Sequence, residues 1–240
     1  MSSLAIQSFS RAASRYRQYA HIQAEMADWV SAWAPKERSG AALEAGAGTG
    51  LLTERLLPWR GRYVATDLSP EMCAVGRREF PEVDWLTMSA AAPLNGPWDW
   101  IFSSSMLQWS DNPAAVFKNW KQVLAPGGRV LAGLFVEGSL PELRGLMNNW
   151  APLVWRSPLA WQQAISAAGL HLVRSEIHER IFWHASAVEM LRGLHRVGAS
   201  PVRRYGAGGL LNMLSRYEAR FRKGAQVRST WTFYRFEAQA

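Results

Sequence analysis

The sequence predicts an α/β fold with a mostly parallel central sheet and helices on both of its faces. Apolar strand-like runs alternate with helix-forming runs across residues 41–136, a pattern typical of such sheets. The first strand-like run ends in closely spaced glycines, Gly46, Gly48 and Gly50, whose bare backbone lets a ligand approach. Hydrophobic residues make up 48% of the sequence, which is enough to build a core. A chain of 240 residues is long enough for one domain with a cap but too short for two full domains.

The segment before the glycine run is predicted to be helical. Apolar residues recur every three to four positions from Phe9 to Val30, which indicates one or two amphipathic helices that end before Pro35. We expect residues 1–34 to form a helical lid that packs on the first strand. Residues 1–24 contain three arginines and no acid, as mitochondrial transit peptides do, but an ordinary helix of the mature protein is the favoured interpretation.

Residues 41–136 contain the predicted cofactor-binding core. Ser69 is the expected N-cap of the helix that starts at Pro70. A turn is expected at 125–128, where Pro and two Gly follow Ala. Ligands in such sheets lie beyond the carboxyl ends of the strands. Strands are expected at 41–46, 62–67, 83–89, 98–105 and 129–136, and further helices at 50–58 and 113–124.

Beyond Gly138 the regular alternation ends. We expect residues 138–215 to form a mainly helical substrate cap and residues 216–240 to return as a helix and a strand, all within a single domain. Helices are expected at 140–150, 158–168, 187–197 and 209–221, and strands at 170–181 and 227–236.

Two acidic residues and the absence of a third fingerprint glycine limit the class of ligand that the pocket can bind. A dinucleotide fingerprint would place its third glycine where Leu51 stands, which disfavours a nicotinamide cofactor. Glu44 lies two residues before Gly46, and Asp67 follows the second strand 21 residues after Gly46, near the spacing at which an acid binds ribose hydroxyls. Such a pair suits a cofactor with both an ammonium group and a ribose. S-adenosylmethionine has both.

The composition limits the partners and the compartment. A net charge of +8 predicts an acidic partner, such as nucleic acid, a phosphate or an acidic protein. Cys73 is the only cysteine, which excludes an internal disulfide and a cysteine cluster for zinc, and we expect no metal. Thirteen tryptophans favour a sizeable apolar pocket. With no apolar run long enough to span a membrane, the chain is expected to be soluble and cytoplasmic.

These motifs resemble those of the class I S-adenosylmethionine-dependent methyltransferases, whose fold is Rossmann-like. The matching segments are Glu44-Ala-Gly-Ala-Gly-Thr-Gly50, Asp67-Leu-Ser-Pro-Glu-Met72 and Leu124-Ala-Pro-Gly-Gly128. They lie within residues 41–136 and are shared by a great many enzymes.

A narrower resemblance extends over nearly the whole chain, to the malonyl-acyl-carrier-protein O-methyltransferase family of biotin synthesis. The matching segments are Phe9-Ser-Arg-Ala-Ala-Ser-Arg-Tyr16 with Ala20 and Gln23, Gln108-Trp109, Gly138-Ser-Leu-Pro-Glu-Leu143 and Leu191-Arg-Gly-Leu-His-Arg-Val-Gly-Ala199.

The resemblance implies the roles of the cofactor residues. Glu44 would hold the amino-acid end, the three glycines would admit the cofactor and Asp67 would hold its ribose. Two positions depart from the family pattern. Ser89 stands where an aspartate near the adenine is usual, and Ser104 stands where an asparagine is usual, so we expect weaker cofactor affinity rather than its loss. The full expected cofactor set is Glu44, Gly46, Gly48, Gly50, Asp67, Leu68, Ser89, Ala90 and Ser104.

The implied reaction is methyl esterification of the free carboxylate of a malonyl thioester carried on acyl carrier protein. Such a carboxylate is ionised near neutral pH and requires no general base, so positioning should dominate catalysis. Arg144 is the candidate clamp for the carboxylate, because an arginine fits it bidentately. Tyr16 is a candidate hydrogen-bond donor to it, with a core aromatic as the alternative. Gln108 and Trp109 are expected where substrate and cofactor meet, with Trp109 as a wall.

Arginines in the cap are candidates to meet an acidic carrier protein or the phosphate of its pantetheine arm, although a solvated helix face is the alternative for any one of them. These are Arg192, Arg196, Arg203 and Arg204. Two other functions stay open. One is methylation of another small carboxylic acid or of nucleic acid, although the absence of an Asn-Pro-Pro-Tyr-type base-methylating motif disfavours nucleic acid. The other is a non-catalytic protein that binds the cofactor or the carrier protein.

Overall fold

The structure is a computed structural model and describes residues 3–146, 154–199 and 207–240. The strands in chain order are β1 Ala42–Ala45, β2 Tyr63–Asp67, β3 Asp84–Thr87, β4 Trp98–Ser104, β5 Leu124–Phe135, β6 His171–His184, β7 Arg222–Lys223 and β8 Gln226–Gln239. The helices are α1 Ser3–Ala12, α2 Tyr16–Tyr19, α3 His21–Ser31, α4 Leu51–Leu56, α5 Pro70–Glu79, α6 Pro113–Val123, α7 Pro141–Arg144, α8 Pro158–Ala167, α9 Ala187–Arg196 and α10 Ala207–Phe221, with 3₁₀ turns η1 Ala13–Arg15 and η2 Leu107–Trp109.

One sheet organises the described residues. Its eight strands follow the order β3-β2-β1-β4-β5-β8-β6, with β7 paired to β8. The pairs from β3 to β5 are parallel, and β8 runs antiparallel to β5 and to β6. The expected mostly parallel sheet is therefore confirmed. From β1 the chain continues to β2 on one side, while β4 lies on the other, so the carboxyl ends of β1 and β4 flank the crevice where ligands bind in such sheets.

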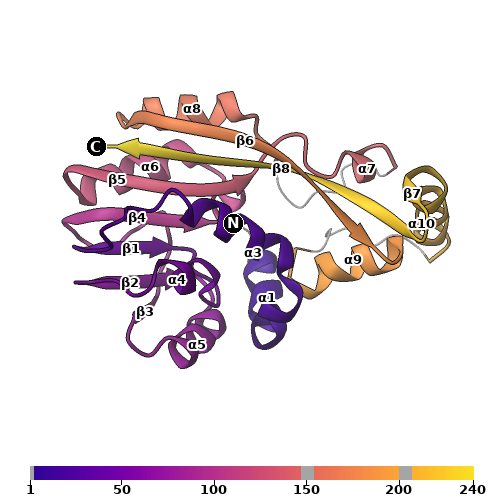
Figure 1. The fold of residues 1–240 in the computed structure, drawn as a ribbon, viewed down its shortest axis with the longest axis horizontal. Coiled ribbons are helices and arrows are strands. Elements are labelled where there is room, and N and C mark those ends of the chain that lie inside the picture. Colours follow the sequence, from indigo (N-terminus) through magenta and orange to yellow (C-terminus); the bar gives the residue numbers. More distant parts are fainter. Residues whose placement is uncertain (1–2, 147–153, 200–206) are drawn as a thin grey trace.

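Helices cover both faces of the sheet, as expected. On one face, α3 places Met26 and Val30 against Phe102 and Leu131 of the central strands. On the other face, α6 and α8 place aromatic and aliphatic side chains, Phe117, Trp120, Trp161 and Ile165 among them, against β4, β5 and β8. Figure 1 shows β6 and β8 extending past the other strands toward α9 and α10.

The N-terminal segment is helical but more divided than the sequence predicts. Three α-helices and the turn η1 replace the expected one or two helices. Ala20, between α2 and α3, has a ψ of 38° and so leaves the helical region. The chain can therefore change direction at Ala20, and α1 and α3 meet different parts of the molecule.

Arginine stacking anchors the end of α3 to the outer strands. The guanidinium of Arg235, on β8, lies 4.3 Å from the ring centre of Trp29 and 4.0 Å from that of Trp33. Arg235 is only 7% exposed and also pairs with Glu176 of β6. Arg174 of β6 lies 4.2 Å from the ring centre of Trp33. Such contacts gain strength as water is excluded, so this end of α3 is firmly held.

Most predicted elements are present, with shifted ends. The side chain of Ser69 caps α5 by accepting from Met72 N at 3.1 Å, as expected. The predicted turn at 125–128 lies inside β5, which already begins at Leu124 and pairs with Trp98 across a bulge. The helix predicted at 140–150 is present as the short α7, and positions 147–150 lie outside the described residues.

The segment 138–215 is less of a separate cap than the sequence suggests. The helix α8 packs on α6, and β6 is the edge strand of the sheet next to β8. Both elements therefore belong to the sheet and the helices that cover it, not to a separate cap. The part that lies beyond these layers is α7, α9 and the start of α10. No helix in the described residues combines the length and apolar character that crossing a membrane requires.

Candidate functional site

The glycine turn after β1 lies at the expected crevice. Gly46, Gly48 and Gly50 have φ values of 72°, 59° and 90°, which side chains with a Cβ rarely adopt. A Cβ on Gly46 would lie 2.2 Å from the side chain of Met106, whereas a Cβ on Gly48 would meet nothing within 4 Å. Gly48 thus borders open space that a ligand can enter.

Glu44 is a buried acid at the base of this turn. It is 1% exposed, and the hydroxyls of Thr53 and Tyr63 each donate to its Oε2 at 2.6 Å. Burial raises the pKa of Glu44 to about 7, although the bonds from Thr53 and Tyr63 act in the opposite direction. Two donors on one oxygen fix the orientation of the carboxyl group. A cation brought by a ligand would stabilise its ionised form.

Asp67 connects the turn to the next strand and helix. Its Oδ2 accepts from Gly48 N at 3.0 Å, and its Oδ1 accepts from Ser69 N at 2.8 Å. Burial raises the pKa of Asp67, and the backbone donors partly offset this rise. The carboxylate is therefore held in place from both sides, with its position set by the glycine turn.

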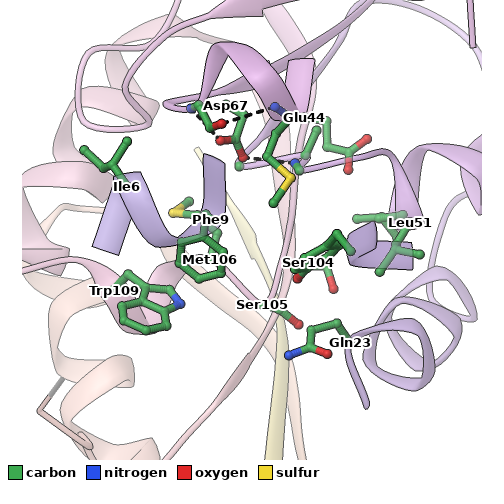
Figure 2. A pocket seen from close by; sticks show the side chains of 17 residues that line it. Ile6, Phe9, Gln23, Glu44, Leu51, Asp67, Ser104, Ser105, Met106 and Trp109 are labelled. Carbon is green, nitrogen blue, oxygen red and sulfur yellow. Dashed lines mark hydrogen bonds between the residues drawn. The ribbon is translucent and has the colours of Figure 1, made fainter. Parts of the chain in front are cut away.

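Three adjoining pockets surround these residues. The glycine-loop pocket of about 660 Å³, counting its open mouth, is lined by Glu44, Gly46, Gly48, Asp67 and Ser104, among others. Figure 2 shows Asp67 and Glu44 on one side of it and Ile6 and Phe9 of α1 on another. The strand-end pocket is lined by Asp67, Leu68, Ser89 and Ala90, and the cap pocket by Tyr16, Gln108, Phe135, Leu194 and Trp231.

Trp109, at the end of η2, joins the three spaces. It lines the glycine-loop pocket, the strand-end pocket and the cap pocket. Phe9 of α1 packs edge-on against it, with ring centres 5.2 Å apart. Trp109 is therefore a wall common to the three pockets, and its role toward a substrate stays a prediction.

Tyr16 and Gln108 also lie at this meeting point. Tyr16 lines both the glycine-loop pocket and the cap pocket. Burial raises the pKa of its phenol well above the ordinary value, and the carboxylate of Asp67 adds to this, so Tyr16 stays protonated and can donate a hydrogen bond. Gln108 lines the cap pocket and donates from Nε2 to Ser105 O at 2.7 Å.

Two predicted site residues lie away from the pockets. Gly50 borders none of the three; a Cβ there would lie 2.6 Å from the ring of Phe80, so its backbone freedom serves the helix start. Arg144 is exposed on α7 and also lines none of the three, although Leu140, one turn earlier, lines the cap pocket. Their roles toward a ligand stay predictions.

Several residues of the site escaped the sequence reasoning. Thr53 and Tyr63 both donate to Glu44, and for Tyr63 the signal lies in the register of β1 with β2. Glu44 pairs with Ala65, and Tyr63 precedes Ala65 by two positions, so it points to the same face. Ser105, with a φ of 57°, lines two pockets and carried no visible signal, because no composition or spacing rule marks a serine at a strand end.

Comparisons with known proteins agree with this geometry. The family described as a methyltransferase domain matches residues 43–130. A malonyl-acyl-carrier-protein O-methyltransferase of Marinomonas sp. is 31% identical over 205 residues, which cover 80% of this chain and 75% of the relative. One of the same name from Hahella chejuensis is 31% identical over 204 residues, covering 80% of this chain and 72% of the relative. The chain belongs to the malonyl-acyl-carrier-protein O-methyltransferase family.

The fold agrees with solved structures as well. The YcgJ protein of Bacillus subtilis superposes with a TM-score of 0.67 at 15% sequence identity, covering 90% of this chain and 97% of that one. With the family match, this confirms the expected class I methyltransferase fold and S-adenosylmethionine as its cofactor.

The residues present fit this cofactor. Open space lies over Gly48, and the carboxylates of Glu44 and Asp67 line the same pocket. In addition, Ser104 Oγ is buried and has no hydrogen-bond partner among the described residues, so a polar ligand atom can satisfy it.

Proposed function

We propose that this chain methylates the free carboxylate of a malonyl thioester on acyl carrier protein, using S-adenosylmethionine, early in the synthesis of the pimeloyl part of biotin. The observation that carries the proposal is the junction of the glycine-loop pocket with the cap pocket at Trp109, in a chain of this family. A cofactor in the first pocket and an acceptor in the second would meet there.

The cofactor residues follow from the geometry of the pockets. Glu44 is proposed to bind the ammonium group and Asp67 the ribose hydroxyls, since both carboxylates line the glycine-loop pocket. The adenine is proposed to occupy the strand-end pocket beside Leu68, Ser89 and Ala90. Gly46 and Gly48 would border the cofactor, and Ser104 would donate one hydrogen bond.

For methyl transfer to a carboxylate, the main task of the protein is to position the two reactants. Bound S-adenosylmethionine supplies a methyl group on a sulfonium; its transfer to a carboxylate oxygen breaks the carbon–sulfur bond, leaves that electron pair on sulfur and moves no proton. The acceptor carboxylate is already ionised near neutral pH, so the chain needs no general base. Tyr16 can donate to the carboxylate, and Trp109 with Phe9 can exclude water from it.

The N-terminal helices are proposed to act as the lid. Ile6, Phe9, Tyr16 and Gln23 all line the glycine-loop pocket, so residues 1–34 contribute one of its walls. Movement of the part of this wall before Ala20 would let the cofactor enter. The substrate cap is proposed to consist of α7, α9 and the described part of α10, with Leu194 of α9 lining the cap pocket.

The carrier protein would meet the basic side of the cap. Arg192 and Arg196 are exposed on α9, and both lie within 3.5 Å of Glu189. Arg203 and Arg204 lie outside the described residues. Steering of an acidic carrier by such charges weakens with salt, so the rate on a carrier-bound acceptor should fall as ionic strength rises. The cytoplasmic location stays a prediction.

One assay tests the function. Incubate the protein with labelled S-adenosylmethionine and malonyl-acyl carrier protein, malonyl-coenzyme A, free dicarboxylic acids or RNA in parallel. Label on the carrier-bound malonyl group, lost on ester hydrolysis, is the expected result. Label only on another acid or on RNA would indicate a different methyltransferase, and no label on any acceptor would indicate a binding protein without catalytic activity.

A further inference from the structure

Five residues line both the glycine-loop pocket and the cap pocket, and we call this set the junction. They are Phe9, Tyr16, Gln23, Ser105 and Trp109. If a cofactor fills the first pocket and an acceptor the second, the reacting atoms meet at the junction. Its polar side chains are therefore placed to bind the end of the acceptor that reacts.

Ser105 is held rigidly at the junction. Its φ of 57° places it in the left-handed region, which is uncommon for a serine and costs energy that the surroundings must offset. Its N–H donates to Gly133 O at 2.8 Å, and its carbonyl accepts from Gln108 Nε2 at 2.7 Å. With its backbone fixed on both sides, Ser105 presents its side chain in one direction.

The hydroxyl of Ser105 lacks a partner. Its Oγ is buried and makes no hydrogen bond to any residue in the described ranges. A buried hydroxyl without a hydrogen-bond partner carries an energetic cost, and binding of a ligand or a water molecule can remove that cost. Figure 2 shows this hydroxyl and the amide of Gln23 directed toward one another at the same side of the pocket. Together they offer donors from the residue that follows β4 and from α3.

The junction carries no cation of its own. Among the described residues that line the glycine-loop pocket and the cap pocket there is no lysine or arginine, whereas the carboxylates of Glu44 and Asp67 are present. Arg144 is exposed outside both. An acceptor carboxylate at the junction would therefore meet neutral donors and the positive charge that the cofactor brings.

Resting on the function proposed above, we propose that Ser105 and Gln23 bind the acceptor carboxylate as neutral hydrogen-bond donors and thereby select an acceptor with a free carboxylate. A guanidinium would engage both carboxylate oxygens at once in a bidentate ion pair. Neutral donors orient the carboxylate while leaving more electron density on the oxygen that attacks the methyl group. Selection then comes from donors that an uncharged acyl end leaves unsatisfied.

The test compares two neighbouring serines. Ser105→Ala removes the junction hydroxyl, whereas Ser104→Ala removes a second buried, unpartnered hydroxyl that lines the glycine-loop pocket but not the cap pocket. For each protein, one measures KM for malonyl-acyl carrier protein, the inhibition constant of acetyl-acyl carrier protein, which has no carboxylate, and the cofactor Kd by calorimetry.

For Ser105→Ala we expect the malonyl KM to rise about tenfold to a hundredfold, as for loss of a hydrogen bond to a charged group. The acetyl inhibition constant and the cofactor Kd should stay within about twofold of the wild type. Gln23→Leu should show the same pattern, and Ser104→Ala should instead raise the cofactor Kd and leave the malonyl KM unchanged. A merely structural effect would shift malonyl and acetyl binding together.

Three results would overturn the inference. The first is a malonyl KM within about twofold of the wild type in both Ser105→Ala and Gln23→Leu. The second is loss of malonyl over acetyl discrimination in Arg144→Ala instead, which would make the arginine the clamp. The third is a wild type that methylates no carboxylic acid, which also removes the proposed function. If the wild type methylates a different acid, only the proposed function fails, and the same variants measured on that acid decide the role of Ser105.

Discussion

The glycine-loop pocket and the cap pocket, which form the cofactor side and the acceptor side of the candidate site, are lined by different kinds of residue. On the cofactor side, Glu44 and Asp67 lie 23 positions apart and are held by donors from the same stretch of chain, so the wall is local, charged and fixed by short hydrogen bonds. The cap pocket instead joins Phe9, Phe135 and Trp231, from opposite ends of the chain, into a wall that is mainly apolar. A shared cofactor can thus be bound by one transferable motif, whereas acceptor choice depends on the whole fold.

The largest expected effect is on the cofactor side. Glu44→Gln removes the ionised carboxylate from the glycine-loop pocket, and the cofactor Kd should rise by about a hundredfold or more, as for breaking a buried charge pair. Calorimetry measures it. Glu82→Gln, which alters an exposed acid outside the three pockets, is the control and should leave Kd unchanged. An unaltered Kd in Glu44→Gln would mean that the charge on this side plays no part in binding.

Trp109→Ala tests whether the two sides are separable at all. Because Trp109 lines all three pockets, its loss should raise both the Kd for the cofactor and the KM for the acceptor, each by about tenfold. Steady-state kinetics with calorimetry separates the two constants. If only one constant changed, Trp109 would belong to one side, and the junction would have to lie elsewhere.

Acidity should weaken the cofactor side specifically. With the pKa of Glu44 at about 7 in the free protein, the fraction ionised, and with it cofactor affinity, should fall about tenfold from pH 8 to pH 6. Tyr63→Phe removes a hydrogen bond that lowers this pKa, so the midpoint should move to higher pH. A Kd that does not vary with pH would show that Glu44 does not bind the cofactor in its ionised form.

Ionisation of Glu44 should also affect folding stability, and in the opposite direction to its effect on cofactor affinity. Its pKa rises from the ordinary 4.5 to about 7, so between these values the native state binds more protons than the unfolded state. The raised pKa of Glu44 therefore stabilises the cofactor-free protein at low pH. This contribution to the free energy of unfolding should be lost as the pH rises through this window. Denaturant titrations of the wild type and Glu44→Gln, compared at pH 5 and pH 8, would measure it.

The smallest expected effect concerns the lid over the cofactor side. Arg17 of α2 pairs with Glu54 of α4 at 2.5 Å and donates to Thr49 O at 3.3 Å. Arg17→Ala should raise the cofactor Kd about twofold to fivefold, since partly exposed ion pairs contribute little. Arg78→Ala, on the exposed face of α5, is the matched control. A change beyond tenfold would mean that the lid holds the cofactor by itself.

The contrast between the two sides also explains how much could be predicted. The mostly parallel sheet and the glycine turn follow from the alternation of strand-like and helix-like runs and from Gly46, Gly48 and Asp67, because these signals are local in sequence. The break at Ala20 has no such signal, since alanine favours helix and only packing bends the chain there. The place of β6 in the sheet also needed tertiary structure. Its strand pattern was visible, but its partner β8 lies more than 40 residues away.

The site shows the same limit. Glu44 and Asp67 could be predicted from their spacing because each lies near the end of a strand, whereas Trp109, in the turn η2 beyond β4, could be predicted only from a resemblance. The prediction for Arg144 rests on the fit of an arginine to a carboxylate, but this chemistry does not determine where the side chain lies, and the fold exposes it on α7. Ser105 became visible only through its backbone conformation and its unsatisfied hydroxyl.

The arginine–tryptophan stack has a consequence for the timing of motion. Arg235 binds the end of α3 to the outer strands, whereas α1 is joined to the core by lighter contacts such as that between Ser10 Oγ and Ser69 Oγ at 2.8 Å. Amide hydrogens of α3 should therefore exchange with solvent as slowly as those of the central strands, and those of α1 much faster. The boundary between slow and fast exchange should lie at Ala20, the point about which the lid would pivot.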